Sequence, residues 1–568
     1  MSDARTANRR IRLLALLFAA AFAATLARAV WIQGVQASSL DRLAANQQTE
    51  VVTLPARRGS ILDQRGLELA VGQQRTTVYA DPRHVKNPRA LVRAAHTFLG
   101  VDATALTRAL ANRKSSFVYV ARQADSVKAQ KLLALKLLGV GSYPEEKRVY
   151  PLQTVAPQLV GFAGVDNKGL EGLELGYDNA LRGRPGEETI VKDPSGQTIN
   201  VLKSRPEQDG SDLVLTLDHT IQQDAEQVLR RTVAHWGAKG ATAIVLDPRT
   251  GAVLAMASVP TYDVNKAAAA PQALHRNRAV TDTYEPGSTF KLVTVAGALS
   301  EHVVTPRTPF TLPYSIHVAD KVIHDAERRP TERLTVADIL SHSSNVGAIT
   351  LSRLLGKASL ARWIERFGFG KATGIDFPGE SAGNVPPVEH WYGSVEGNIP
   401  IGQGLAVTPL QMAAAYAAIA NGGVWEQPHI VDHVAGQKGP KLKHRRVVSE
   451  GVAQEMMKML QGVVDEAVGT GTLARVAGYH VAGKTGTAAK PDGKGGYSTR
   501  DYVASFVGAV PATNPRLVIL VSVDSPRGSI WGGVVAAPAF SDIARFDLQY
   551  LEVIPDAPGG GDEAKAPQ

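Results

Sequence analysis

Two side chains capable of nucleophilic chemistry lie one helical turn apart in the stretch TYEPGSTFKLVTVAGALS, residues 283–300. Ser288 follows the helix-breaking pair Pro286-Gly287, and Lys291 lies three residues later, on the same face of a helix. The helix is apolar around almost its whole circumference, so we expect it to be buried. Burial lowers the pKa of a lysine, and a neutral amine beside a hydroxyl is a general base beside a nucleophile. The spacing therefore predicts a serine acyl-transfer centre, whereas a capping serine and a solvent-reaching lysine would produce the same pattern.

A second polar cluster, Ser343, Ser344 and Asn345, fills the break between two helices in LTVADILSHSSNVGAITLSRLLG. We expect the first of these helices to have Thr335 as its N-cap and to end near Ser341. Serine and asparagine cap helices routinely, so capping is one interpretation of the cluster. The other interpretation is a polar turn that presents a hydroxyl and an amide to the same cleft as the serine–lysine pair.

The third motif, in HVAGKTGTAAK, contains Lys484, Thr485, Gly486 and Thr487 after a short strand. A cation, a hydroxyl and a glycine on an edge strand form a receptor for a carboxylate, with room for a substrate backbone. Lys484 taken alone could equally be a surface lysine on a sheet edge.

The hydrophobic pattern indicates the elements that position these motifs. A strand, DLVLTLD, and a helix, HTIQQDAEQVLRRTVAHW, precede a hairpin in which the turn PRTG joins GATAIVLD to AVLAMAS. Near the end of the chain, YVASFVGAVPATNPRLVILVSVD forms another hairpin, which turns at Asn514-Pro515. Strands at both ends with helices between them predict an α/β (α+β) domain, with an antiparallel sheet covered by helices.

The amino-terminal segment has the pattern of a membrane anchor. Residues 13–32 form a run of 20 with one charge, Arg28, and such a run just spans a bilayer. Four arginines precede the run: Arg5, Arg9, Arg10 and Arg12. We predict a cytoplasmic tail at 1–12 and a transmembrane anchor at 13–34, with the basic flank inside and the rest exported. A cleaved signal peptide is the alternative, because Ala27-Arg28-Ala29 resembles a cleavage site.

Length and composition restrict the number of domains and the kinds of functional site that the chain could have. A chain of 568 residues is too long for one core, so two or three domains are expected. The absence of cysteine excludes disulfides, thiolate zinc sites and cysteine nucleophiles. The net charge of +9 suits an anionic membrane surface or a merely solvated face, and no basic stripe indicates nucleic acid. One cluster of possible ligands has no standard zinc spacing, so no metal is expected: His317, Asp320, His324 and Asp325.

Together the three motifs resemble the signature of penicillin-recognising serine enzymes. Ser343 follows Ser288 by 55 residues and Lys484 follows Ser343 by 141, which suits that family. The resemblance extends to ARRGSILDQRG, GLEGLELGYDNALRG, IGQGLAVTPLQMAAAYAAIANGG and KTGTAAKPDGKGGYSTRDYVASFVGAVPA. We identify the chain as a member of the class B penicillin-binding proteins, most similar to their FtsI-like division branch. The chain departs from the family at residues 63–66, which read Asp-Gln-Arg-Gly where Asp-Arg-Asn-Gly is usual.

The resemblance implies a penicillin-binding transpeptidase fold, with an antiparallel five-stranded sheet covered by helices. An elongated α+β pedestal and a single amino-terminal transmembrane helix would precede it. We accordingly predict a pedestal (dimerisation-type) domain at 37–210, a transpeptidase domain at 212–554 and a disordered tail at 555–568.

The resemblance also implies an activity, that of a D,D-transpeptidase that cross-links peptidoglycan stem peptides through an acyl-enzyme in septal wall synthesis. β-Lactams would inhibit such an enzyme covalently. Ser288 would attack the peptide, Lys291 would take its proton, and Lys484 would act with Thr485 on the terminal carboxylate. Ser343 and Asn345 would relay protons and hold the substrate amide. The predicted substrate-binding residues are Thr485, Gly486, Thr487 and Ser344. The N–H groups of Ser288 and Thr487 would form the oxyanion hole.

The partners implied by the family are lipid-linked glycan strands, an FtsW-type glycan polymerase and other divisome membrane proteins, with no cofactor. The implied location is the inner (cytoplasmic) membrane, with the catalytic domain outside. Three alternatives remain open at this point. They are an elongation-type transpeptidase of the same class, a β-lactamase or β-lactam sensor, and a non-catalytic division scaffold.

Overall fold

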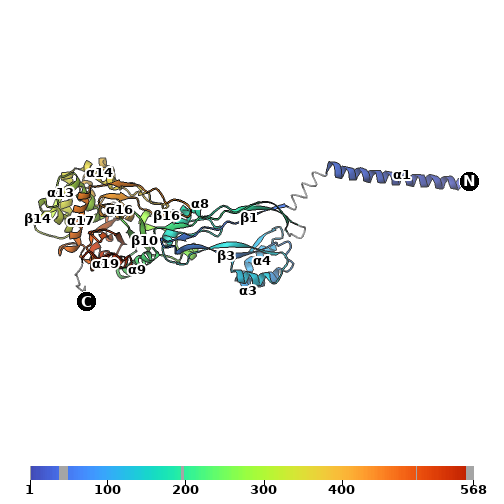
Figure 1. Ribbon diagram of the computed structural model, residues 1–568, viewed down its shortest axis with the longest axis horizontal. Helices are drawn as coiled ribbons and strands as arrows, with labels where there is room; N and C mark the ends of the chain where they lie inside the picture. The colour runs from blue at the N-terminus through green and yellow to red at the C-terminus, as the bar shows by residue number, and fades with distance from the viewer. Residues whose placement is uncertain (1, 37–48, 193–197, 494–495, 558–568) are drawn as a thin grey trace. The chain divides into compact units, whose positions relative to one another are not determined.

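The computed structural model describes residues 2–36, 49–192, 198–493 and 496–557 (Figure 1). The chain divides into two compact units, each made of two stretches of sequence. The first comprises Met1–Arg57 with Gly183–Gly210, and the second comprises Arg58–Arg182 with Ser211–Gln568. The predicted disordered tail lies, from residue 558 onward, outside the described residues.

The first unit contains a long apolar helix and a small sheet. Helix α1, Ser2–Val30, continues into a π-helical turn, η1, at Trp31–Val35. The segment Ala7–Val35 is long and apolar enough to cross a membrane. Because it lies near the amino terminus, a signal sequence would have the same length and composition. The sheet is antiparallel, in the order β1-β6-β7. Its strands are β1 (Thr49–Leu54), β6 (Gly186–Lys192) and β7 (Thr198–Arg205).

Six strands of the second unit form a mixed sheet in the order β16-β8-β2-β3-β4, with β5 also paired to β3. The parallel pair is β2 with β8, so a strand from before residue 182 lies beside one from after residue 211. The strands are β2 (Ile61–Leu62), β3 (Glu68–Ala80), β4 (Val118–Ala124), β5 (Val140–Val149), β8 (Leu213–Leu215) and β16 (Val431–Val434). The accompanying helices are α3 (Pro88–Leu99), α4 (Ala103–Ala111), α5 (Ser126–Leu133), α6 (Pro157–Val160), α7 (Gly172–Gly176) and α8 (Asp178–Leu181).

The unusual turn at residues 63–66 contacts the start of helix α9, His219–Trp236. Gln64 Nε2 donates to Asp218 Oδ2 at 2.8 Å, and the Arg65 guanidinium lies 3.2 Å from the same oxygen. Asp218 is the N-cap of α9, accepting from Thr220 N–H at 2.9 Å. The two residues that depart from the family pattern therefore both bind the carboxylate that caps this helix.

The predicted five-stranded antiparallel sheet is confirmed, with the strand order β10-β9-β20-β19-β18. Both predicted hairpins are present, β9–β10 and β19–β20. The sheet strands are β9 (Gly240–Leu246), β10 (Val253–Val259), β18 (Ala482–Pro491), β19 (Tyr497–Val510) and β20 (Leu517–Asp524). The central strands are buried on both faces because helices cover each side.

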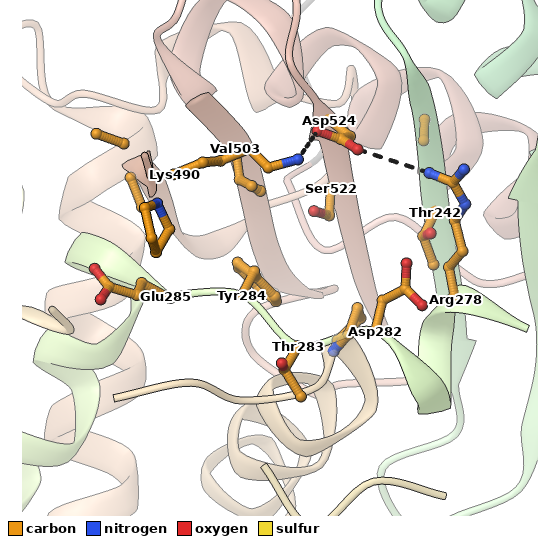
Figure 2. A pocket seen from close by; sticks show the side chains of 15 residues that line it. Thr242, Arg278, Asp282, Thr283, Tyr284, Glu285, Lys490, Val503, Ser522 and Asp524 are labelled. Carbon is orange, nitrogen blue, oxygen red and sulfur yellow. Dashed lines mark hydrogen bonds and ion pairs between the residues drawn. The ribbon is translucent and has the colours of Figure 1, made fainter. Parts of the chain in front are cut away.

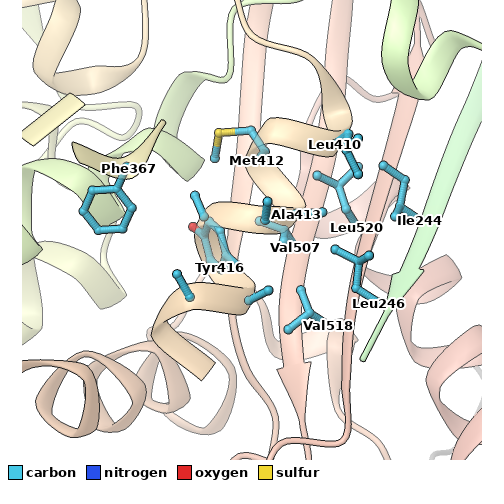
Figure 3. Packing of buried hydrophobic residues seen from close by; sticks show 14 of the residues in the cluster. Ile244, Leu246, Phe367, Leu410, Met412, Ala413, Tyr416, Val507, Val518 and Leu520 are labelled. Carbon is cyan, nitrogen blue, oxygen red and sulfur yellow. The ribbon is translucent and has the colours of Figure 1, made fainter. Parts of the chain in front are cut away.

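Helices α9 and α19 (Ala537–Tyr550) pack on one face of this sheet (Figure 1). On the other face, α16 (Pro409–Ala420) packs its apolar side chains against β9, β19 and β20, as Figure 3 shows for Leu410 and Tyr416. Helix α16 starts with Thr408 as N-cap, Pro409 in the first turn and a capping box to Gln411. Helix α17 (Glu450–Asp465) and the nucleophile helix α11 (Lys291–Ser300) share this core.

The remaining elements also belong to the second unit. The helices are α10 (Arg278–Thr281), α12 (Val336–Ser341), α13 (Asn345–Leu355), α14 (Lys357–Phe367), α15 (Val395–Asn398) and α18 (Gly532–Val535). The 3₁₀ helices are η2 (Val264–Ala269), η3 (Gln272–Leu274), η4 (Gly287–Phe290), η5 (Val388–His390), η6 (Ile399–Ile401) and η7 (Thr472–Ala474). The strands are β11 (Pro309–Leu312), β12 (Ser315–Val318), β13 (Lys321–His324), β14 (Glu332–Thr335), β15 (Val424–Glu426) and β17 (His444–Arg446).

Candidate active site

Ser288 lies in a 3₁₀ turn, η4, that leads directly into α11, rather than in the first turn of the α-helix itself. The turn depends on Gly287, which has a φ of +54°. Its N–H donates to the Gly402 carbonyl at 3.0 Å, and a Cβ at this position would lie 2.9 Å from the Thr487 carbonyl oxygen. The glycine therefore lets the nucleophile turn pack closely against strand β18.

Lys291 is the centre of a hydrogen-bond network that joins two of the three predicted motifs. Its side chain is fully buried. The ammonium nitrogen Nζ lies 3.1 Å from Ser288 Oγ, 3.2 Å from Ser343 Oγ and 2.8 Å from Asn345 Oδ1. It also donates to the Ser343 carbonyl at 2.5 Å. The sequence expectation that α11 is buried all round is met, since Lys291 through Leu299 are all buried.

The environment of this amine changes its acid–base chemistry. Burial lowers the pKa of Lys291 to about 7, and the negative charge of Asp325 partly opposes that shift. Near neutral pH the amine is therefore about half neutral. A neutral Nζ within hydrogen-bond reach of Ser288 Oγ can accept the proton of the hydroxyl as the oxygen attacks.

The turn between α12 and α13 presents two side chains to Lys291. Helix α12 begins and ends as predicted, with Thr335 as its N-cap and Ser341 as its last residue. Ser343 has a φ of 59°, a left-handed conformation that costs a residue other than glycine about 1–3 kcal/mol. This conformation brings both the hydroxyl and the carbonyl of Ser343 to the same amine. Asn345 is fixed by a bond from its Nδ2 to the His324 carbonyl at 3.0 Å.

Ser344, which the sequence analysis expects to bind substrate, caps a helix in the structure. It is the N-cap of α13, and its hydroxyl accepts from the Gly347 N–H at 2.9 Å. The same hydroxyl donates to Asp325 at 3.0 Å, and only 2% of the residue is exposed. Capping, the alternative interpretation of this cluster, is therefore correct for Ser344, whereas its two neighbours contact the lysine.

Asp325 and Arg329 form an anchor for this turn that the sequence analysis missed. Asp325 accepts from the Val346 N–H at 3.0 Å as well as from Ser344, and Arg329 pairs with it at 2.6 Å. Arg329 in turn donates to the Leu312 carbonyl at 2.9 Å. Asp325 was considered only as a metal ligand, and among the described residues no group of three or more acidic or histidine side chains is arranged to hold a metal. The arginine four residues after the aspartate was the available signal.

The third motif forms a second polar cluster. Lys484 lies within the edge strand β18, not after it, and is fully buried. Its Nζ lies 3.2 Å from Thr485 Oγ1 and 3.5 Å from Thr470 Oγ1, and the two threonine oxygens are 2.8 Å apart. Burial, reinforced by the charge of Lys291, holds the pKa of Lys484 well below its usual range. Thr470, in the loop after α17, is a further hydroxyl that the sequence motifs did not reveal.

Gly486 is required for packing, and its expected contact with a substrate backbone stays a prediction. A Cβ on this residue would lie 2.4 Å from Ser505 Oγ and 2.9 Å from Thr289 Cγ2, so only glycine lets β18 approach the nucleophile turn. One residue further, Thr487 Oγ1 accepts from the Gly532 N–H at 3.1 Å. The side chain of Thr487 is thus held by α18, which fixes the strand beside the turn that carries Ser288.

The geometry assembles Ser288, Lys291, Ser343 and Asn345 into one network and Lys484, Thr485 and Thr470 into another. The first network holds a hydroxyl next to a buried amine, which suits acyl transfer through a serine ester. The second holds a buried cation with two hydroxyls, which suits recognition of a carboxylate.

Two family models match the chain. The penicillin binding protein transpeptidase domain matches residues 241–545, which include all three motifs. The penicillin-binding protein dimerisation domain matches residues 53–215.

Curated relatives cover nearly the whole chain. Peptidoglycan D,D-transpeptidase FtsI of Escherichia coli is 34% identical over 562 residues, 98% of this chain and 94% of the relative. Stage V sporulation protein D of Bacillus subtilis is 34% identical over 565 residues, 97% of this chain and 87% of the relative. The probable peptidoglycan D,D-transpeptidase PbpC of Pseudomonas aeruginosa is 33% identical over 556 residues, 97% of this chain and 96% of the relative.

Solved structures show the same fold. A peptidoglycan synthetase from Bifidobacterium adolescentis superposes with a TM-score of 0.74 at 29% identity, covering 90% of this chain and 98% of that one. Penicillin binding protein 3 from Mycobacterium tuberculosis, complexed with aztreonam, has a TM-score of 0.71 at 30% identity, covering 89% of this chain and 99% of that one. The chain therefore belongs to the class B penicillin-binding proteins, the family of peptidoglycan D,D-transpeptidases.

Proposed function

We propose that Ser288 is the acylated nucleophile of a peptidoglycan D,D-transpeptidase and that Lys291 is its general base. The observation that carries the proposal is the fully buried amine of Lys291, which lies 3.1 Å from Ser288 Oγ and has a pKa of about 7. An amine that is neutral near physiological pH can take up the hydroxyl proton in the step in which the oxygen needs to lose it.

In the first half-reaction, Ser288 Oγ attacks the carbonyl of the terminal D-alanyl-D-alanine bond, and its proton passes to Lys291 Nζ. The C–N bond then breaks and the leaving D-alanine carries away a proton, so that a serine ester remains. Ser343 and Asn345 are placed to pass that proton and to hold the substrate amide, since both contact Nζ. In the second half-reaction, an amine of a neighbouring stem attacks the ester, forms the cross-link and frees Ser288.

Lys484, with Thr485 and Thr470, would bind the terminal carboxylate of the donor. The contact between Gly287 and Thr487 brings the nucleophile turn and β18 together, which supports an oxyanion hole made by the N–H groups of Ser288 and Thr487. In studied enzymes one such donor contributes about 3–4 kcal/mol to transition-state stabilisation.

β-Lactams should inhibit the protein by the same chemistry. Attack by Ser288 on the lactam carbonyl opens the ring, and the leaving amine stays tethered to the acyl group, so it cannot diffuse away. The solved complex of a Mycobacterium tuberculosis relative with aztreonam supports this expectation.

Labelling with a fluorescent penicillin tests the proposed site. We expect stoichiometric covalent labelling of the wild type and none of Ser288→Ala, with a matched Ser359→Ala control on the partly exposed surface of α14 labelling like the wild type. Undiminished labelling of Ser288→Ala would refute the assignment of the nucleophile. Fast hydrolytic turnover of the drug would instead indicate a β-lactamase.

We further propose that the enzyme works in septal wall synthesis, anchored by α1 in the cytoplasmic membrane with its catalytic domain outside. The similarity to FtsI of Escherichia coli supports the division role, and an FtsW-type glycan polymerase is the partner which that role implies. The basic flank at Arg9, Arg10 and Arg12 supports a cytoplasmic amino terminus. Under this proposal residues 37–210 form the pedestal and 212–554 the catalytic domain.

A fluorescent fusion tests the division role, because a septal enzyme concentrates at midcell and an elongation enzyme follows the side wall. Protease treatment of spheroplasts tests the topology. Digestion of the catalytic domain from outside is expected, and full protection would contradict the orientation.

A further inference from the structure

Basic side chains of the second unit are neutralised in one place and left without an acid in another. In the cavity that Figure 2 shows, Lys490 lies 2.6 Å and Arg278 3.7 Å from Asp524, so the two cations share one acid. Arg366, in the last turn of α14, and Arg445, in β17, have no acid within ion-pair distance among the described residues. The positive charges of this second pair are therefore not compensated within the described part of the chain.

Arg445 is held in place without a hydrogen bond from its guanidinium group to any described residue. Its Cζ lies 4.2 Å from the ring centre of the buried Trp425, the residue opposite it on β15. Nη1 is buried and has no acceptor among the described residues, and Nη2 lies against Gly368, where a Cβ would be 2.7 Å away. Burial lowers the pKa of Arg445, and the charge of Arg366 lowers it further. A buried donor without an acceptor is costly, and an acceptor that reaches it recovers that cost.

Arg366 brings a second guanidinium group close to the first. It is exposed, and its Cζ lies 5.1 Å from the ring centre of Trp363, one helical turn earlier. The neighbouring acid Glu365 is already paired with Lys371 at 2.7 Å. Each guanidinium group is thus stacked on a tryptophan, which fixes its plane and leaves its N–H groups for another partner. Because like charges repel, the pair with Arg445 is unfavourable until an anion lies between the two groups.

The charge and shape of this pair suit a phosphate group. A guanidinium fork binds a carboxylate or a phosphate through two parallel N–H bonds. A carboxylate brings one charge and two oxygens in a single plane, whereas a terminal phosphate brings about two charges and three oxygens, which can face two forks at once. A phosphate would therefore supply both the missing acceptor for Nη1 of Arg445 and the missing negative charge.

Further cations extend the same basic surface. The Lys443 carbonyl accepts from the Gln427 N–H at 2.9 Å, so the antiparallel pairing continues beyond β17 and Lys443 lies on the same side of the strand as Arg445. Arg362 lies one helical turn before Arg366 on α14. Lys443 and Arg362 are exposed, and neither has an ion pair among the described residues. A ligand with several phosphates in a row would contact more of these cations than a single phosphate would.

We propose that Arg366 and Arg445 form a binding site for a phosphate group. The phosphate is either a single anion or one member of a chain, in which case Lys443 and Arg362 contact its neighbours. None of these four residues belongs to the two networks around Lys291 and Lys484, so the inference is independent of the proposed function.

Isothermal titration calorimetry at low salt tests the site with three probes: inorganic phosphate, inorganic tripolyphosphate and N-acetyl-triglutamate. We expect the phosphate probes to bind and the carboxylate probe to bind far more weakly. Arg366→Met and Arg445→Met should each weaken phosphate binding about tenfold or more, the effect of losing a charge-assisted hydrogen bond. Arg445→Lys should also lose most of the affinity, because lysine keeps the charge but has no planar fork.

The ratio of the two phosphate affinities identifies the form of the ligand. Tripolyphosphate that binds about tenfold more tightly than phosphate would identify a chain, since its outer groups gain charge-assisted contacts with Lys443 and Arg362. Equal affinities would identify a single anion.

A matched control is Lys458→Gln, which removes an exposed cation from α17 and should leave both phosphate affinities unchanged. Melting temperatures show whether each variant is folded. No binding of either phosphate probe to the wild type, equal binding of the carboxylate probe, or wild-type affinity in a folded Arg366→Met or Arg445→Met would overturn the site. If Arg445→Met does not fold, Arg366→Met, which changes an exposed side chain, still decides.

Discussion

Acylation of Ser288 is predicted to follow the titration of Lys291. Because burial lowers the pKa of this lysine to about 7, roughly 9% of the amine is neutral at pH 6 and roughly 91% at pH 8. If the neutral amine is the base, the acylation rate constant should rise about tenfold between these two pH values and then level off.

The size of the change separates this account from one with an ordinary lysine. A lysine with the usual pKa of 10.5 would increase its neutral fraction about a hundredfold from pH 6 to pH 8 and continue to rise beyond pH 9. The levelling near pH 8 is therefore as diagnostic as the rise itself.

The assay is the rate of labelling by a fluorescent penicillin at limiting drug concentration, measured from pH 5.5 to pH 9.5. Lys291→Met is the reference and should lose nearly all labelling. Melting temperatures measured over the same pH range show whether unfolding contributes to any change in the labelling rate. The unfolded chain binds more protons at Lys291 between about pH 7 and pH 10.5, so this residue makes stability rise with pH across that window. A rate that is flat between pH 6 and pH 8, or that still rises log-linearly at pH 9, would refute the reasoning.

Three further predictions concern Asp325, Thr470 and Asp224. Asp325→Asn removes the charge that raises the pKa of Lys291, so the inflection of the acylation profile should move to lower pH, and acylation should slow about tenfold as the turn at Ser344 loosens; an unmoved inflection would contradict this. Thr470→Val removes a hydroxyl 2.8 Å from Thr485 and should raise KM about tenfold for carboxylate-bearing donors, with melting temperature unchanged; steady-state kinetics that show an unaltered KM would contradict it. Burial raises the pKa of Asp224 to about 6, so its folded form holds a proton that the unfolded chain loses near pH 4, and stability falls as pH rises between these values. Asp224→Asn should therefore raise the melting temperature at pH 8 but not at pH 4, and an equal gain at both would argue against the shift.

Much of the fold could be predicted because local pattern and tertiary structure agree. The apolar run after Ser288 is a buried helix, and the turns at PRTG and Asn514-Pro515 join antiparallel strands. Helix α9 has the predicted extent because Asp218 caps its start and Gly237 adopts the left-handed conformation at its end.

What the sequence did not reveal depends on contacts between distant segments. Ser344 could not be separated from Ser343, because the difference lies in Asp325, 19 residues before Ser344, which takes up only one of the two hydroxyls. Thr470 gave no local signal, since its role comes from its contact with the hydroxyl of Thr485, 15 residues later in the chain.

Two other features that the sequence did not reveal also depend on contacts between distant segments. The constraint on Gly486 lies in Ser505 of the neighbouring strand and Thr289 of the nucleophile turn, and the sequence alone gave no reason to place either there. The parallel pairing of β2 with β8 joins Ile61 to Leu213, and two such short strands have no pattern that would specify a partner.

The central claim is that the hydroxyl beside the buried amine accepts the acyl group, and peptide mapping by mass spectrometry tests it most directly. After brief exposure of the purified protein to benzylpenicillin, the account predicts one adduct per chain, located on Ser288 and absent from Lys291→Met over the same interval. An adduct on Ser343 or on any other side chain, or no adduct on folded wild-type protein, would contradict it.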